Sequence, residues 1–372
     1  MTEAHDPLRR RWLGALALGG LLPGFAVATP PGAPAASARL LAAWQSDNDH
    51  RIGLIDLGAG QARVHRELLV PTRAHGLLVE AGGSVLAMAR RPGDWLVRWH
   101  PQSDATQWQW VEDDRHFNGH VVASPDGRTL WTTETDRESG QGRVALRQAR
   151  TLRKTTEFAT LGMDPHEMLV LPQRVGDVPA GSLLVANGGI PSLPETGRAK
   201  RDLDRMDASL VALDGGSGRV LGQWRLRDPR LSIRHLAWDP VSACVGIALQ
   251  AEHDDPDARR AAPVLAVWNG RELVTAHGQP ALAGYGGDIC ARAEGGFLVS
   301  CTRAHQVALF GAGGQWQNSI ALEEACALGE VAGTWWAAGR LSALGGGGTD
   351  RASLSTDLPA GSRIDNHWLA FG

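Results

Sequence analysis

Five histidines occupy equivalent places in a repeated sequence pattern, and their side chains are suited to binding a metal ion. Each one opens a short apolar segment that is followed by a tight turn and a second apolar segment, as His120, the turn 125–127 and residues 129–134 illustrate. Neutral imidazole is the commonest protein ligand for transition metals. We therefore predict a site for iron, copper or zinc where the imidazoles converge. Its candidate ligands are His75, His120, His166, His235 and His367.

The same histidines also allow other interpretations. A polar residue that opens each repeat can simply hydrogen-bond a neighbouring repeat or water, and a histidine can serve as a general base or bind an anion. The spacing lacks a compact ligand motif such as H-E-x-x-H, so it specifies neither the ion nor its coordination number. Asp288 and Glu330 take the equivalent place in two further repeats. We expect their carboxylates to complete the ring.

Four polar residues near the histidines are candidates for binding a cofactor or an anion. Arg73 and Arg234 lie next to two of the histidines, Arg91 ends the second segment of its repeat, and Asn187 lies in a turn. Guanidinium groups suit carboxylates and phosphates. A structural role is the alternative, because buried arginines could pair with Asp136, Asp164 or Glu134.

The spacing of the pattern predicts the elements that must bring these residues together. Successive polar positions from His75 to Glu330 are separated by 45, 46, 69, 53 and 42 residues, and His367 follows 37 residues later. A repeat of 40–50 residues built from four short strands is typical of a propeller blade. The longest step contains an insertion at 190–206. We therefore predict an all-β fold, a single seven-bladed β-propeller over residues 38–372, with the histidines in its central channel.

The two ends of this region are expected to close the ring. Strands expected at 39–44, 51–57 and 62–69 lack an inner partner, and residues 366–371 can supply it. Such pairing removes the exposed strand edges of an open sheet. The outer strands of the preceding blade, within 341–362, have no clear sequence pattern, and the sequence contains no convincing amphipathic helix.

The N-terminus has the features of an export signal. Residues 1–28 contain Arg9-Arg10-Arg11, an apolar run of 17 residues from Trp12 and the cleavage signal 26–28. The order fits a twin-arginine-type signal peptide, and the run is shorter than the ~20 apolar residues of a membrane anchor. We expect residues 29–37 to form a disordered leader. The mature protein is then periplasmic, with no membrane contact after cleavage.

Composition excludes several classes of protein. The net charge of −3 gives no basic surface for nucleic acid, and four cysteines in 372 residues are too few for a disulfide scaffold. Cys290 and Cys301 lie on adjacent expected strands and could form a bridge after export, although free thiols are the default. The sequence has no G-x-S-x-G, P-loop or C-x-x-C-H motif, which weighs against a serine hydrolase, an NTPase and a c-type cytochrome. We expect a monomer.

A set of short motifs around these residues resembles a family of exported bacterial proteins of unknown function. That family is related in fold to YVTN/WD40-like propellers and to the quinoprotein amine dehydrogenase heavy chain. The resemblance covers about residues 38–370. Its motifs are Arg73-Ala74-His75-Gly76, Ala89-Arg90-Arg91-Pro92-Gly93, Asn118-Gly119-His120, Pro165-His166-Glu167, Val185-Ala186-Asn187-Gly188-Gly189-Ile190, Ser232-Ile233-Arg234-His235-Leu236 and Asp365-Asn366-His367.

The resemblance implies a context rather than an activity. Members look like neighbours, in gene clusters, of imelysin-type periplasmic proteins and of a di-haem peroxidase-like protein, which implies a part in iron or copper handling with such partners. We rank a metal- or anion-binding propeller first. A channel-site enzyme, such as a metal- or histidine-dependent hydrolase or lyase, comes second, and a protein-interaction scaffold third. Fold kinship with quinoprotein enzymes does not carry their catalysis to this chain.

Overall fold

Short strands make up most of the chain, as the repeated turns and apolar segments predict. The computed structural model describes residues 37–58, 60–191, 202–347 and 352–372. The expected signal peptide 1–28, nearly all of the leader 29–37 and most of the insertion lie outside the described residues, so these predictions stay predictions. The ends of the insertion do join the second and third strands of one sheet, as expected.

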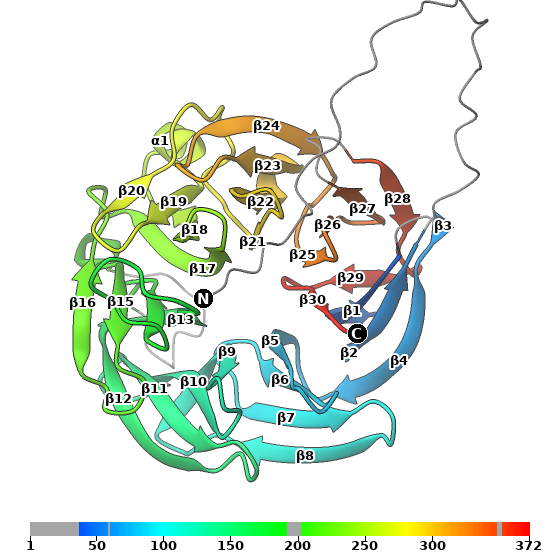
Figure 1. Cartoon of the computed structure of the whole chain (residues 1–372), viewed down its shortest axis with the longest axis horizontal. Helices are drawn as coiled ribbons and strands as arrows, with labels where there is room; N and C mark the ends of the chain where they lie inside the picture. The colour runs from blue at the N-terminus through cyan, green and yellow to red at the C-terminus, as the bar shows by residue number, and fades with distance from the viewer. Residues whose placement is uncertain (1–36, 59, 192–201, 348–351) are drawn as a thin grey trace, which may run out of the picture. The chain divides into compact units, whose positions relative to one another are not determined.

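The strands form seven sheets, which Figure 1 shows around a common centre. Three sheets are β5 (Ala74–Val79), β6 (Val85–Ala89), β7 (Trp95–His100) and β8 (Ala105–Trp110); β9 (Arg115–Ala123), β10 (Thr129–Asp136), β11 (Gln141–Gln148) and β12 (Lys154–Met163); and β13 (Pro165–Val170), β14 (Leu183–Asn187), β15 (Ser209–Leu213) and β16 (Val220–Trp224). Three more are β17 (Leu231–Asp239), β18 (Cys244–Ala251), β19 (Leu265–Trp268) and β20 (Leu273–Thr275); β21 (Ile289–Ala291), β22 (Phe297–Cys301), β23 (Gln306–Phe310) and β24 (Trp316–Ala321); and β25 (Leu328–Val331), β26 (Thr334–Ala338), β27 (Ser342–Gly347) and β28 (Leu354–Asp357). The seventh combines β1 (Ala38–Ser46), β2 (Asp49–Leu57) and β4 (Arg63–Val70) with β29 (Ser362–Ile364) and β30 (Leu369–Ala370).

The innermost strands of these sheets form a closed ring. Each first strand contacts the first strand of the next sheet, from β5 through β9, β13, β17 and β21 to β25. β30 contacts both β25 and β5, which completes the circle. The prediction of a seven-bladed β-propeller is therefore confirmed. The blade that the sequence left unclear has its outer strands at β27 and β28.

The seventh blade is built from both ends of the described chain. β1 pairs with β2 on one side and with the C-terminal segment on the other, where Leu41 lies opposite Leu369 and Trp44 lies opposite Ile364. The C-terminal strand is thus longer than the sequence predicts, because β29 adds a part before Asn366. A two-residue strand, β3 (Gly60–Gln61), pairs in parallel with β28 of the preceding blade.

Apolar side chains fill the spaces between neighbouring blades. One buried cluster joins β14 and β15 to β17, β18 and β19, and another joins β26 to β1 through Trp336 and Trp44. Trp95, Trp99 and Trp268 are also fully buried. Each inner strand is therefore held by packing on both of its faces, which positions the residues that it turns toward the axis.

Among the described residues, one short α-helix and two 3-10 helices, Leu203–Arg205 and Thr302–Ala304, depart from the all-strand sequence pattern. α1 (Pro256–Ala261) connects β18 to β19, and the side chain of Asp255 accepts hydrogen bonds from the backbone of Asp257 and Ala258 at its start. A helix of six residues is too short for its apolar spacing to be visible in the sequence. Within the described residues, no helix is long and apolar enough to cross a membrane.

The cysteines form no disulfide bond. All four cysteines are free, and Cys290 lies opposite Leu298 rather than Cys301 across the strand pair, so the bridge that export would permit is not formed.

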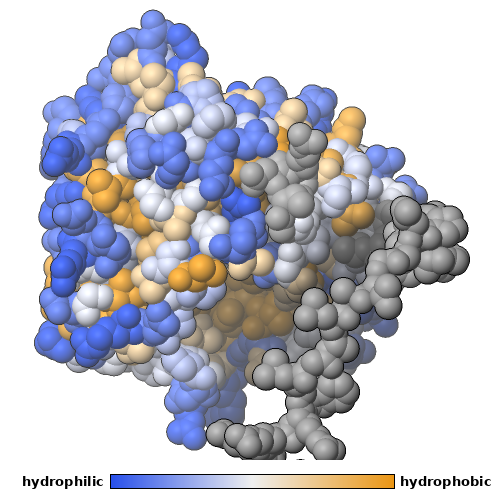
Figure 2. All heavy atoms as spheres, turned by 45° about the horizontal axis from the view of Figure 1, so that its top comes forward, coloured by the Kyte–Doolittle hydropathy of each residue, from blue (hydrophilic) through white to orange (hydrophobic). Residues whose placement is uncertain are grey.

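The face drawn in Figure 2 is mainly hydrophilic, with hydrophobic groups between the hydrophilic ones. Exposed large apolar side chains such as Leu69, Trp110 and Val274 belong to the outermost strands of different blades.

Candidate metal centre

β-Bulges in the innermost strands position the histidines. In β5, pairing with β6 shifts between Ala74 and Leu77, so His75 and Gly76 lie opposite one residue of the partner. His120, His166 and His235 lie in corresponding irregularities of β9, β13 and β17. A bulge bends its strand and re-aims the side chains within it. In β5, β9, β13 and β17 the repeated polar position is therefore the place where the inner strand turns a side chain toward the axis.

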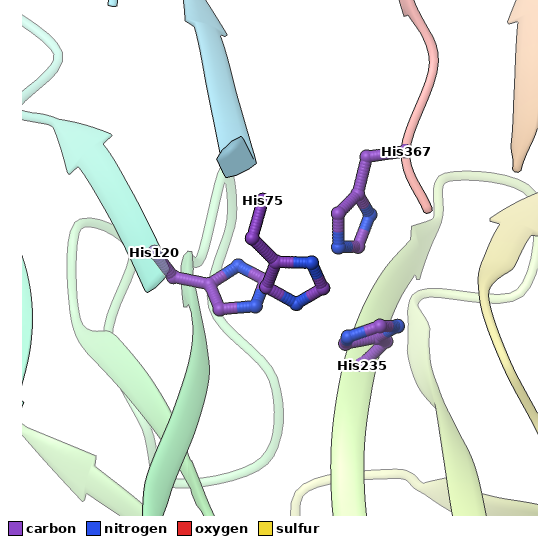
Figure 3. Close-up of side chains that lie close together, drawn as sticks. All are labelled: His75, His120, His235 and His367. Carbon is purple, nitrogen blue, oxygen red and sulfur yellow. The ribbon is translucent and has the colours of Figure 1, made fainter. Parts of the chain in front are cut away.

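The four bulges, together with the segment between β29 and β30 that carries His367, bring all five histidines together. Ring centroids of neighbouring imidazoles lie 4.4 to 5.5 Å apart, and each ring is buried or nearly so. His75, His120, His235 and His367 each offer a nitrogen, and these four atoms lie within 4.8 Å of one another. Figure 3 shows these four side chains reaching the same point from different blades. The fifth, His166, places its Nε2 2.7 Å from Nε2 of His235.

Three carboxylates stand behind the imidazoles. Nδ1 of His367 lies 3.0 Å from Oδ1 of Asp288, and Nδ1 of His235 lies 3.7 Å from the same oxygen. The Nδ1 atoms of His75 and His120 lie 3.8 and 3.9 Å from Asp365 and Glu167. Only the first separation is a hydrogen bond, but all four face a carboxylate in the way that metal-bound histidines commonly do.

Every histidine of the cluster has a buried ring nitrogen without a hydrogen-bond partner. These atoms are Nε2 of His75, His120 and His367, and Nδ1 of His75, His166 and His235. A buried nitrogen without a partner is costly unless a ligand completes it. Because Nδ1 of His75, His120, His235 and His367 faces a carboxylate, Nε2 of these four rings is the candidate ligand atom.

The backbone holds the carboxylates in place. Asp288 accepts hydrogen bonds from the backbone N–H of Leu328, at 2.8 Å, and of His367, at 3.1 Å. Glu167 accepts one from the backbone of Leu236 at 2.7 Å. The contacts with Leu328 and Leu236 join neighbouring blades, and the contact with His367 joins the blade of β21 to the seventh blade. The orientation of the imidazoles is thus set by groups that span the ring.

Burial keeps most of the cluster neutral. It lowers the pKa of His75 to about 3 and holds those of His120, His166 and His235 well below the usual value. Burial opposes charge on His367 too, but Asp288 outweighs it and raises the pKa of His367 to about 9. Neutral imidazole is the form that binds a metal. Four of the five rings are therefore already in that form at neutral pH.

One expected member of the ring does not belong to it. The side chain of Glu330 is exposed, and it accepts a hydrogen bond from the backbone of Gly333. β25 begins at Leu328, so Glu330 lies beyond the start of its strand. The repeat alignment was wrong in this blade by a few residues. Asp288 does lie beside the imidazoles, as the sequence predicts.

The predicted cofactor-binding residues have partners within the protein. One carboxylate, Asp164, accepts hydrogen bonds from both Arg91 and Arg234, the latter at 2.7 Å. Arg73 donates to both oxygens of Asp365 through Nε and Nη2. The pairing with Asp164 is the structural alternative that the sequence left open. Arg91 and Arg234 nevertheless lie beside the histidines, because they line the same small cavity as His75, His166 and His235.

Asn187 has a position apart from this cluster. Its Nδ2 donates to the backbone oxygen of Thr160 at 2.9 Å and lies 3.3 Å from Oγ of Ser209. Its side chain therefore joins β12 to the next blade. It is not among the residues that line the cavities beside the histidines.

Two cavities lead to the histidines from one face. A small cavity of about 30 Å³ lies directly beside the imidazoles, and a larger vestibule of about 580 Å³ lies beside it. Arg90, Tyr285 and Asn366 line both. The small cavity is also lined by His75, Arg91, His166, Arg234, His235 and Gln250. The vestibule gives the site an approach from outside.

Two carboxylates of the site, Glu167 and Asp365, were not expected from the sequence, and Asp164 was expected only as a possible partner of an arginine. Glu167 follows His166, Asp365 lies two residues before His367, and Asp164 lies two residues before His166. Each was within a motif or close to one, so a carboxylate within two residues of a repeated histidine was the available signal. Which carboxylate meets which imidazole depends on the packing of adjacent blades.

Comparison with solved structures agrees with the fold. Hydrazine synthase of Kuenenia stuttgartiensis has a TM-score of 0.57 at 12% identity, with 85% of this chain and 96% of that chain covered. A catalytically inactive virginiamycin B lyase from Staphylococcus aureus, solved with quinupristin, has a TM-score of 0.54 at 9% identity, covering 76% and 84%. A streptogramin B lyase has 0.54 at 10% identity, covering 80% and 90%. Identities this low show the fold alone.

Comparison with protein sequences gives a family but no activity. The profile of a family described as "Protein of unknown function (DUF1513)" matches residues 68–371. No curated protein matches the sequence. These comparisons therefore assign a family and no activity.

Proposed function

This chain belongs to the DUF1513 family, whose function is unknown, and from its histidine site we propose that it is a metal-binding protein. The channel binds one transition metal ion through Nε2 of His75, His120, His235 and His367. His166 is close enough to His235 to act as a fifth ligand. The observation that carries the proposal is the meeting of four buried nitrogens within 4.8 Å.

The donor set favours particular ions. Imidazole nitrogen suits zinc, copper, iron and nickel, whereas calcium and magnesium prefer oxygen ligands. The carboxylates behind the rings support this reading, because a partner at Nδ1 fixes the ring and leaves Nε2 for the metal. Copper, zinc and iron are therefore the ions to test first.

The cellular setting is part of the same proposal. Residues 1–28 direct export, and the mature protein takes part in periplasmic iron or copper handling. Proteins of the imelysin type and di-haem peroxidase-like proteins are its proposed partners. The sequence of residues 1–28 and the family resemblance support this setting.

The test is metal analysis of the purified protein. Protein loaded separately with Cu(II), Zn(II) and Fe(II) under argon, then desalted, is expected to keep about one equivalent of at least one ion by plasma mass spectrometry. The double variant H75A/H235A should lose it. The control H277A changes an exposed histidine outside the cluster, and this variant should bind the metal ion as the wild type does. Failure to retain any of the three ions overturns the proposal.

A further inference from the structure

A buried arginine beside the histidines has one side of its guanidinium unused. Arg234 is 1% exposed, and its Nη1 donates to Asp164 at 2.7 Å. Its Nε and Nη2 are buried and have no hydrogen-bond partner. These two N–H groups share one edge of the planar group and form a fork that fits the two oxygens of a carboxylate.

Other arginines of the protein show what that fork binds. Arg225 uses Nε and Nη2 to hold both oxygens of Asp207, at 2.7 and 2.9 Å. Arg73 holds both oxygens of Asp365 in the same way. The fork of Arg234 faces no such carboxylate. Glu252 acts on Arg234 electrostatically, yet neither Nε nor Nη2 donates to it.

The lining of the small cavity also favours an anion. Arg91 and Arg234 share the carboxylate of Asp164, and both arginines and Arg90 line the cavity beside the imidazoles. No acidic residue is among the described residues that line it. An anion in the cavity therefore faces positive groups and no lining carboxylate.

The cavities have the right sizes for a small carboxylate. The small cavity of about 30 Å³ has room for roughly two water molecules or one carboxylate group. The adjoining vestibule is lined by four arginines, Arg73, Arg90, Arg340 and Arg363, and by one acidic residue, Glu324. Arg73 is paired with Asp365 and Arg340 with Glu323 and Glu324, but the lining still has more basic than acidic residues. An anion is therefore attracted to the entrance, and only its terminal oxygens fit beside the histidines.

We propose that the small cavity binds the carboxylate group of a small organic anion, held bidentately by Nε and Nη2 of Arg234. The body of the anion occupies the vestibule. This inference rests on the proposed function in one respect. When a metal is bound by the histidines that line the same cavity, the carboxylate lies beside it, and the protein takes the metal and the anion together.

The test uses formate, the smallest carboxylate, as the probe. Saturation-transfer NMR on the formate proton measures binding to the metal-free protein and to protein loaded with Zn(II). We expect saturable binding to both forms, with a dissociation constant of about 1 mM or weaker, the limit for a ligand of three non-hydrogen atoms. R234K should weaken binding at least tenfold, because lysine keeps the charge but lacks the fork. R234M should abolish it.

Two controls make the result interpretable. R225K removes an exposed fork that is already filled by Asp207, and it should leave formate binding unchanged. Thermal unfolding of each variant reports whether it folds. If R234M does not fold, the comparison of the wild type with R234K still shows whether the fork of Arg234 binds formate.

The outcomes separate this inference from the metal proposal. Absence of saturable formate binding in both forms of the wild type, or equal binding by R234K and the wild type, overturns the anion site. Metal retention together with either of those results leaves the proposed function intact. Arg234-dependent formate binding without metal retention has the opposite meaning, because the anion site then stands and the metal proposal fails.

Discussion

Asp288 is the residue that most directly controls the histidine cluster. Its carboxylate accepts hydrogen bonds from the backbone of three residues, and it lies 3.0 Å from Nδ1 of His367. It therefore fixes both the ring orientation of His367 and the nitrogen that is left for a metal. The same carboxylate faces Nδ1 of His235.

The variant D288N should weaken metal binding without removing a ligand. Asparagine has the same shape but no charge, so we expect a 10- to 100-fold loss of metal affinity, roughly the range for such second partners. Competition with a chromophoric chelator measures it. The matched control is E330Q, because the sequence assigned Glu330 the same role and its side chain is exposed. Equal affinities for D288N and the wild type would contradict the carboxylate's role.

A histidine outside the cluster makes stability depend on pH. Burial, with help from Arg137 and Arg91, lowers the pKa of His116 to about 4. The unfolded chain has the ordinary value of about 6.5 and so binds the proton first as the pH falls. This residue therefore lowers the stability of the folded state between pH 6.5 and 4.

Replacing that histidine should flatten the acid dependence. At pH 4.5 the wild type is expected to lose about 2–3 kcal/mol of stability to His116 that H116Q does not lose, while the effect is absent at pH 7.5. Urea unfolding of both proteins at the two pH values gives the difference. A pH-independent difference between the proteins would show that His116 is protonated equally in both states.

At the level of strands, the bulges and their glycines place the rings. Gly119 has a φ of +101°, and a Cβ there would lie 2.9 Å from Cδ2 of His75. Gly76 approaches the backbone of Gly119 so closely that a Cβ has no room. The two inner strands β5 and β9 can therefore meet at the axis only because both positions lack a side chain.

The substitution G119A should disturb the metal site as well as stability. We expect a loss of at least about 1–2 kcal/mol from the left-handed backbone, and displacement of His75 that weakens metal binding at least tenfold. The control G127A has a φ of +67° and open space around its Cβ. It should lose similar stability but keep its metal affinity. Chemical denaturation and the chelator assay separate the two effects.

For the molecule as a whole, ring closure and site assembly are the same event. His367 lies between β29 and β30, the segment that pairs with β1 to complete the seventh blade. Ile364 and Trp368, on either side of it, are buried in the cluster that also contains Trp44 and Trp336. The last ligand therefore arrives only when the two ends of the described chain pair.

Truncation before residue 362 should abolish cooperative folding. It removes β29, β30 and two buried apolar side chains, a loss of more than about 5 kcal/mol, which is comparable to the stability of a typical domain. Limited proteolysis and thermal unfolding monitor the result. In contrast, H367A keeps the closing strands, so it should unfold cooperatively and lose only metal binding. Cooperative unfolding of the truncated protein would mean that closure is not required.

The blades were predictable because the repeat recurs along the chain, and the closure followed from a missing inner strand. Asp288 was predicted from its place in the repeat, but Glu167 and Asp365 were not, because contacts such as that of Asp365 with Arg73 join residues across nearly the full length of the sequence. Glu330 was misplaced because β25 is only four residues long, so a shift of a few residues takes the side chain to solvent. α1 has too few residues to show a helical period.

The sequence by itself determined the number of blades, the predominance of strands and the type of side chain that most of the inner strands present. Those features depend on local periodicity and turns, which the order of residues contains. Only the tertiary structure decided which imidazole nitrogen is free, which carboxylate stands behind each ring and that Arg234 has an unused fork. The physical reason is that these properties depend on contacts between blades, where bulge geometry and packing act over a few ångströms between residues that are distant in the chain.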